Sequence, residues 1–187
     1  FLALALIVFA VREPERPQGL RAVRNPISLA EIKNLGPAYW WVVAVASVFT
    51  LARFSEAFLV LRGQQLGLPM AWVPAVILAM SLVYAASAYP AGLAARYWSR
   101  RTLLATGLAV LIGADLVLAS ADGIVLVLAG AALWGLHMGL TQGLLAALVA
   151  DAVPPERTGT AFGFFHLATG VFLLLASGAG LLAAALM

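Results

Sequence analysis

The sequence contains five long apolar stretches, separated by short segments that hold most of its charged residues. These stretches cover residues 37–61, 70–91, 102–120, 123–150 and 159–187. A helix needs roughly 20 apolar residues to cross a hydrocarbon core about 30 Å thick. Each stretch therefore predicts a membrane-crossing helix, and together they predict an all-α, polytopic transmembrane helix bundle.

Composition supports the same class and excludes a water-soluble domain. Hydrophobic residues make up 64% of the chain and charged residues 10%, against roughly 45–50% and about 25% in soluble domains. So few charges could not cover so much apolar surface in water, and the lipid bilayer is the expected surrounding. The basic residues are spread over the connecting segments rather than gathered on one face, so we expect no nucleic-acid partner.

The first part of the chain is predicted to form two further regions before the transmembrane bundle of 37–187. Residues 1–11 are apolar but too short for a span, and arginines follow them rather than precede them, unlike in a signal peptide. We expect 1–11 to be the end of a truncated span and the chain to be a fragment of a longer protein. Residues 12–36 are predicted to be a cytoplasmic central loop. In this loop Ser28 and Glu31 form a helix-start pattern and favour a short interfacial helix at 28–34, with a plain linker as the alternative.

The positive charges predict how the bundle is oriented. Of the 11 Lys and Arg residues, all but Arg53 and Arg62 lie in connections that fall on one side if every stretch is a span. Cytoplasmic loops carry the excess of Lys and Arg, so this side is predicted to be the cytoplasm. A missed span would scramble this asymmetry, so the asymmetry also supports the number of spans.

Two of these cytoplasmic connections carry motif-like patterns. Residues 89–101, YPAGLAARYWSRR, resemble the G-x-x-x-D-R-x-G-R-R loop of the major facilitator superfamily, with Gly92, Arg100 and Arg101 retained. Residues 154–163, PPERTGTAFG, resemble the P-x-x-x-R-G-x-x-x-G loop of the same family, and this segment includes Arg157 and Gly159.

The resemblance implies a fold and a function. It implies the C-terminal half of a two-half transporter, from the end of span 6 through span 11, with the N-terminal half of the same protein as its partner. It also implies transport of a small-molecule substrate by alternating access. The chain departs from the family pattern at Arg96, where the family has an Asp. A cation at the positive end of a helix is unfavourable, so Arg96 cannot replace that Asp in holding the two halves closed.

Ionisable residues inside a span are costly and usually face a partner or an aqueous path. Arg53 and Glu56 lie within 37–61, and a spacing of three residues predicts that they share one helix face. One interpretation is a cavity-lining site in which Arg53 binds charge and Glu56 takes up a proton. The alternative is a buried ion pair that only fixes helix packing.

The stretch 123–150 has the most regular pattern. Gly135, Gly139 and Gly143 recur every four residues, which predicts a face for close helix packing. The opposite face is predicted to line a cavity through three residues, Trp134, His137 and Thr141. A proton-coupling role for His137 and a simple hydrogen bond to a neighbouring helix are the two alternatives.

The remaining intramembrane polar residues give weaker predictions. Asp115 is a proton-coupling candidate, either paired across helices with Arg53 or protonated. Ser81 and Tyr84 are predicted to share a cavity-lining face. For His166 a hydrogen bond in the core is expected. Asp151 ends its predicted helix, where a negative charge is unfavourable, so Arg100 or Arg157 is expected beside it.

Together these patterns favour a secondary active transporter of a small solute, with proton coupling as a hypothesis. The sequence lacks cysteine and the common nucleophile, zinc-protease and P-loop motifs, so we expect no enzyme, cofactor or metal site. A polytopic membrane enzyme and a non-transporting membrane scaffold are the alternatives. The compact loops and the composition favour a bacterial inner membrane as the location.

Overall fold

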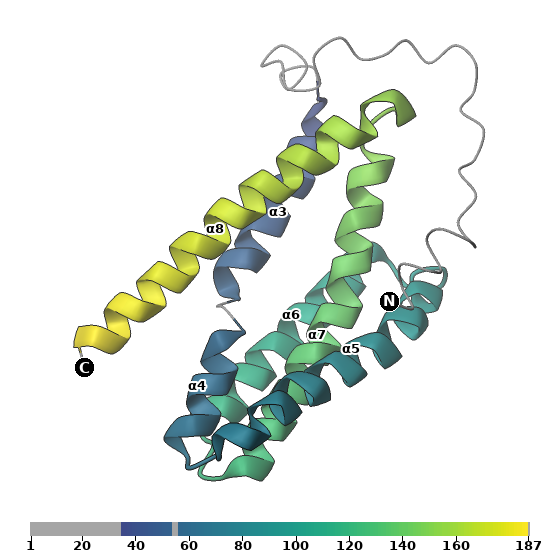
Figure 1. The fold of residues 1–187 in the computed structure, drawn as a ribbon. Coiled ribbons are helices and arrows are strands. Elements are labelled where there is room, and N and C mark those ends of the chain that lie inside the picture. The colour runs from purple at the N-terminus through teal and green to yellow at the C-terminus, as the bar shows by residue number, and fades with distance from the viewer. Residues whose placement is uncertain (1–34, 54–55, 187) are drawn as a thin grey trace, which may run out of the picture.

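The computed structural model describes residues 35–53 and 56–186, and all regular structure in these ranges is helical. The predicted all-α bundle is confirmed. The segments predicted at 1–11 and 12–34, with the interfacial helix at 28–34, lie outside the described residues. The main helices are α3 (Pro37–Ala52), α4 (Ala57–Gln65), α5 (Val73–Ala94), α6 (Arg100–Ala119), α7 (Ile124–Asp151) and α8 (Thr158–Leu186) (Figure 1).

The helices match the predicted spans closely, with one exception. In the described part of the chain, four helical segments are long and apolar enough to cross a membrane, and they include α5, α6, α7 and α8. The exception is the stretch 37–61, for which an uninterrupted helix was predicted. That prediction is wrong, because α3 has only 16 residues and α4 follows it as a separate helix of 9 residues.

The break between α3 and α4 occurs at Arg53, whose backbone is extended, with φ −105° and ψ 119°. The sequence around it contains neither Pro nor Gly, the usual causes of an interrupted helix. The two helices pack against different partners: Tyr39 and Val43 of α3 join a core with α7 and α8, whereas Leu59 of α4 joins a core with α5, α6 and α7. The break therefore separates a helix that packs in one core from a helix that packs in the other.

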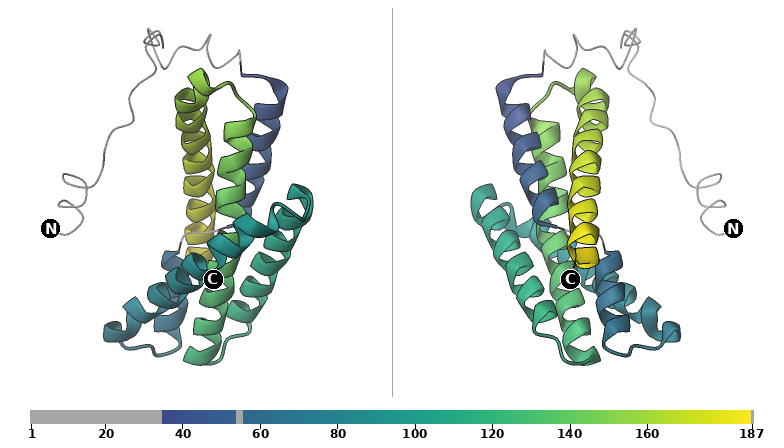
Figure 2. Two further views of the ribbon diagram at one scale, coloured as in Figure 1. Left: turned by 90° about the vertical axis from the view of Figure 1, so that its right-hand side faces the viewer. Right: turned by 90° about the vertical axis from the view of Figure 1, so that its left-hand side faces the viewer.

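Helix α7 runs the length of the bundle and packs in both hydrophobic cores. Figures 1 and 2 show α3 and α8 beside one half of α7, and α4, α5 and α6 around its other half. Residues from Val127 to Met138 of α7 belong to one hydrophobic core, and residues from Leu145 to Val149 belong to the other. Thr141 and Gln142 lie in the stretch of α7 between these two groups, and His137 lies just before it.

The connections between helices are short and well capped. After α4, Gly67 adopts a left-handed backbone with φ 84°. The Leu68 N–H bonds to the Gly63 carbonyl at 2.9 Å and the Gly67 N–H to the Gln64 carbonyl at 3.0 Å. This is the Schellman arrangement, which favours glycine at the left-handed position. At the start of α6, the Ser99 hydroxyl accepts from the Thr102 N–H at 3.1 Å and caps the helix.

Charged residues mark the two ends of the bundle. At the predicted cytoplasmic end, Arg100 at the start of α6 pairs with Asp151 at the end of α7, with 2.5 Å between Nη2 and Oδ2. The expectation of a basic partner for Asp151 is therefore confirmed for Arg100. At the opposite end, Arg62 of α4 donates hydrogen bonds to the carbonyls of Leu118, Ala119 and Ala121, at the end of α6.

Candidate functional site

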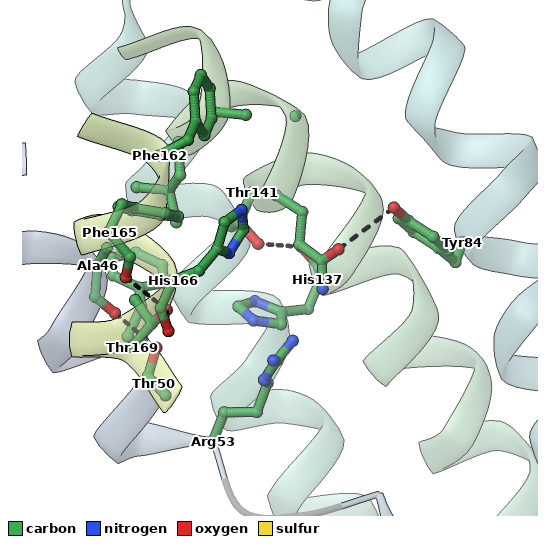
Figure 3. A pocket seen from close by; sticks show the side chains of 15 residues that line it. Ala46, Thr50, Arg53, Tyr84, His137, Thr141, Phe162, Phe165, His166 and Thr169 are labelled. Carbon is green, nitrogen blue, oxygen red and sulfur yellow. Dashed lines mark hydrogen bonds between the residues drawn. The ribbon is translucent and has the colours of Figure 1, made fainter. Parts of the chain in front are cut away.

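A cavity of about 500 Å³ lies between α3, α5, α7 and α8, at the level where the two hydrophobic cores separate (Figure 3). Eight polar side chains line it: Thr50, Arg53, Tyr84, His137, Thr141, Gln142, His166 and Thr169. Aromatic rings from α3 and α8 form much of the remaining wall. Because these residues include the middle of α5 and α7 and the end of α3, the cavity reaches the middle of the bundle.

Arg53 is brought to this cavity by the end of α3. Its guanidinium carbon lies 5.9 Å from the centroid of the Trp134 ring. Figure 3 shows the side chain extending toward the imidazole of His137. A cation over the face of an indole is attracted by the ring quadrupole, which partly offsets the cost of placing a charge inside the membrane.

Glu56 lies just before α4, on the other side of the break, and does not line the cavity. The prediction that Arg53 and Glu56 share one helix face is wrong, because no continuous helix joins them. Within residues 35–53 and 56–186, the one ion pair found joins Arg100 and Asp151, so Arg53 and Glu56 do not form the close pair considered from the sequence. A role for Glu56 in proton coupling stays a prediction.

The imidazole of His137 contacts α6 and α3. Its Nδ1 lies 2.8 Å from the Gly107 carbonyl of α6, and because a carbonyl can only accept, Nδ1 carries the proton of this bond. Its ring stacks on Phe49 of α3, with centroids 6.2 Å apart. The Thr141 hydroxyl donates to the His137 carbonyl at 2.8 Å one turn along α7. The Gly107 bond and the Phe49 stack orient the imidazole, and His137 and Thr141 both line the cavity.

Trp134 differs from the other two residues predicted on this face of α7. It is fully buried in the core and is not part of the cavity lining. Its indole N–H donates to Oδ1 of Asp115 on α6 at 3.3 Å. Asp115 is therefore connected to Arg53 only through the indole ring that lies between them, and no direct ion pair joins the two within the described residues.

Tyr84 lines the cavity, and its hydroxyl donates to Oε1 of Gln142 at 3.3 Å. Ser81, one turn earlier on α5, is exposed on the outside of the bundle and does not reach the cavity. The predicted shared lining face of Ser81 and Tyr84 is therefore wrong for Ser81. Gln142, which carried little information in the sequence, is the partner that orients Tyr84.

Several lining residues were not found from the sequence. On α8, Phe162, Phe165, His166 and Thr169 face the cavity. The hydrogen bond in the core expected for His166 is wrong, since its ring is exposed and stacks on Phe162 with centroids 6.1 Å apart. The spacing of these residues, at steps of three and four, is a signal for one helix face, but nothing in the sequence shows which face is turned inward.

The glycines of α7 fall into two groups. A methyl group on Gly135 would overlap the Met80 carbonyl of α5, and one on Gly139 would overlap Ser87 of the same helix. Both therefore lie where α5 approaches α7 closely. Gly143 lines the cavity, and a methyl group there would meet no atom within 4 Å. No helix contact among the described residues therefore supports its predicted packing role. Gly107 of α6, which was not singled out, closely approaches Thr141.

The residues of the cytoplasmic loop motifs lie away from the cavity. A methyl group on Gly92 or Gly159 would meet no atom within 4 Å, so neither glycine marks a close helix contact within the described chain. Arg100 pairs with Asp151, and Arg101 is exposed. Among the residues that the structure describes, no group of three or more His, Cys, Asp or Glu could hold a metal ion.

Comparison with known proteins agrees with this architecture. Residues 1–182 match the sequence model of the Major Facilitator Superfamily. No curated protein and no solved structure matches the chain.

Proposed function

The chain belongs to the Major Facilitator Superfamily and is part of a polytopic integral membrane transporter. We propose that it carries out secondary active transport of a small solute by alternating access. The observation that carries this proposal is the cavity between α3, α5, α7 and α8. Its volume of about 500 Å³ falls within the roughly 300–1,000 Å³ of small-molecule sites. We propose that the N-terminal half of the protein completes this cavity, and that the location is a bacterial inner membrane.

The cavity favours transport over the alternative of a membrane scaffold. A scaffold predicts that Arg53 and Glu56 pair only with each other and that no cavity lies beside them. Instead, Arg53 lines a cavity and forms no ion pair with Glu56. Extended backbone at membrane depth, as at Arg53, is tolerated where it is buried in protein or borders a water-filled space, which supports the same proposal.

The alternative of a membrane enzyme has less support. Such an enzyme needs reactive groups gathered at one membrane face. The polar lining here comes from α3, α5, α7 and α8 at mid-depth, and among the described residues it contains no carboxylate. Binding and release of a solute fit this lining better than covalent chemistry does.

Transport is tested with the full-length protein in proteoliposomes, by following uptake of a solute panel with and without a pH gradient. We expect accumulation that collapses when the gradient is removed. Proton coupling further predicts that Glu56→Gln, Asp115→Asn or His137→Gln weakens the dependence on the gradient. Glu156→Gln removes an exposed carboxylate beside α8 and serves as the matched control. Accumulation that is the same in the three variants and in the control would overturn proton coupling through these residues.

A further inference from the structure

Arg53 is the one side chain with a permanent charge among the described residues that line the cavity. In this part of the chain no carboxylate lies within ion-pair distance of it. Glu56 attracts it from beyond ion-pair distance, and the face of Trp134 attracts the cation but accepts no in-plane hydrogen bond from the guanidinium. A guanidinium has five N–H donors in a planar fork. Within the described contacts, none of these donors reaches an acceptor.

The hydroxyl groups of the cavity behave differently, because most of their hydrogens are already used. Thr50 donates to the Ala46 carbonyl at 2.8 Å, and Thr169 donates to the Phe165 carbonyl at 2.8 Å. Thr141 donates to the carbonyl of His137, and Tyr84 donates to Gln142. A polyhydroxyl solute such as a sugar needs many free donors and acceptors, and this lining offers few free donors besides the guanidinium.

Aromatic rings form much of the remaining wall. Phe49 stacks on His137, and Phe162 stacks on His166, with a ring-centroid separation near 6 Å in each pair. Phe165 meets Phe162 edge to face, with centroids 6.5 Å apart. These rings come from α3 and α8 and lie on the same cavity as Arg53 (Figure 3). Such a wall suits a flat apolar group rather than a second charge.

We propose that this cavity binds small aromatic monocarboxylates, with the carboxylate on the guanidinium of Arg53 and the aromatic body against Phe49, Phe162 and Phe165. The planar fork of arginine matches a carboxylate through two parallel hydrogen bonds. When a cation inside a membrane has unused hydrogen-bond donors, an anionic ligand stabilises it more than a neutral ligand does. This substrate class rests on the proposed transport function, because the same cavity serves both.

The test measures binding of three acids, benzoate, phenylacetate and 2-naphthoate, to the purified full-length protein by calorimetry. Each acid is compared with its amide, and benzoate also with benzylammonium and acetate. We expect the acids to bind at least about tenfold more tightly than the amides, since a charge-assisted hydrogen bond is lost. Acetate binds more weakly than benzoate because it lacks the ring, and benzylammonium does not bind.

Variants locate the effect at Arg53. Arg53→Gln lowers the affinity for the acids by about tenfold or more, and Arg53→Lys lowers it less because the charge remains. Arg96→Gln removes an exposed arginine at the cytoplasmic surface and leaves the affinity unchanged. The comparison of acid and amide on the unmodified protein needs no variant, so it stands if Arg53→Gln does not fold. Equal affinities for acids and amides, or no binding of any acid, would overturn the proposal.

Transport in proteoliposomes separates this proposal from the general one. If a neutral or cationic solute is transported equally well by the unmodified protein and by Arg53→Gln, the substrate class is wrong and the transport function stands. If the acids bind in an Arg53-dependent way but no solute moves under any gradient, the transport function is wrong and the anion site stands.

Discussion

The indole N–H of Trp134 donates a hydrogen bond to Asp115 across 3.3 Å and joins α7 to α6 in the middle of the bundle. The same ring has the guanidinium of Arg53 near its face. One buried side chain therefore contacts both of the charged residues that the sequence suggested as a direct pair. The indole ring takes the position between them, which makes its polar edge important for stability.

Replacing Trp134 by Phe removes this donor and leaves the carboxylate of Asp115 without it. A polar group left unsatisfied costs about 1–3 kcal/mol, and the smaller ring adds a packing loss. A double-mutant cycle separates the two effects. In an Asp115→Leu background the cost of Trp134→Phe should fall by about 1–3 kcal/mol, measured from unfolding in detergent micelles. Equal costs in both backgrounds would show that the hydrogen bond contributes little.

Two glycines on the same helix should respond oppositely to an added methyl group. Gly135→Ala places the methyl group against the Met80 carbonyl, a backbone atom that cannot move without shifting α5. Overpacking of this kind costs about 1–3 kcal/mol or more. Gly143→Ala meets open space and should be neutral or slightly stabilising, because alanine favours helix. Thermal unfolding of the two purified variants is the measurement, and similar losses in both would contradict the close approach of α5 to α7.

Arg62 connects α4 to the end of α6 through three backbone carbonyls, those of Leu118, Ala119 and Ala121. The last carbonyls of a helix have no partner within it, and a cation there also favours the helix dipole. Arg62→Ala should lower the free energy of unfolding by about 1–3 kcal/mol and speed amide hydrogen exchange near the end of α6. The control Arg96→Ala alters an exposed arginine and should change stability by less than about 0.5 kcal/mol. If both variants lose the same stability, the capping role of Arg62 is not supported.

The pair of Arg100 and Asp151 should contribute little, because its side chains are 48% and 57% exposed. Exposed ion pairs are worth about 0–1 kcal/mol and weaken with salt. Each residue also opposes the dipole of its own helix, since Arg100 begins α6 and Asp151 ends α7.

Exchanging the two residues, as Arg100→Asp with Asp151→Arg, keeps the ion pair. It places the acidic residue at the start of α6 and the basic residue at the end of α7, where each charge is favourable to the helix dipole. At low salt, the free energy of unfolding of the exchanged protein should exceed that of the original by about 0.3 to 1 kcal/mol. Each single charge reversal should be less stable than the exchanged protein. Melting curves at low and high salt would measure this. A large loss in the exchanged protein would mean that this end of the bundle depends on the original arrangement.

The sequence by itself determined the class of the protein, four of the five predicted spans and the family, and the family match confirms the last of these. The sidedness stays a prediction. The reason is physical: in lipid, a span must satisfy its own backbone hydrogen bonds and present about 20 apolar residues, so it leaves a mark in the sequence. The described bounds of α5, α6 and α7 differ from the predicted ones by only a few residues.

The tertiary structure alone decided which faces of these helices turn toward the cavity. In water, a helix marks its buried face by an apolar stripe, but in lipid both the outer and the inner faces are apolar, so the pattern loses this information. His137 and Ser81 were both predicted to line the cavity, and His137 lines it whereas Ser81 does not. The break at Arg53 separates α3 and α4, which pack in different cores, and no Pro or Gly nearby marks it in the sequence. A site made by four helices is therefore set by how they pack, and not by any one of their sequences.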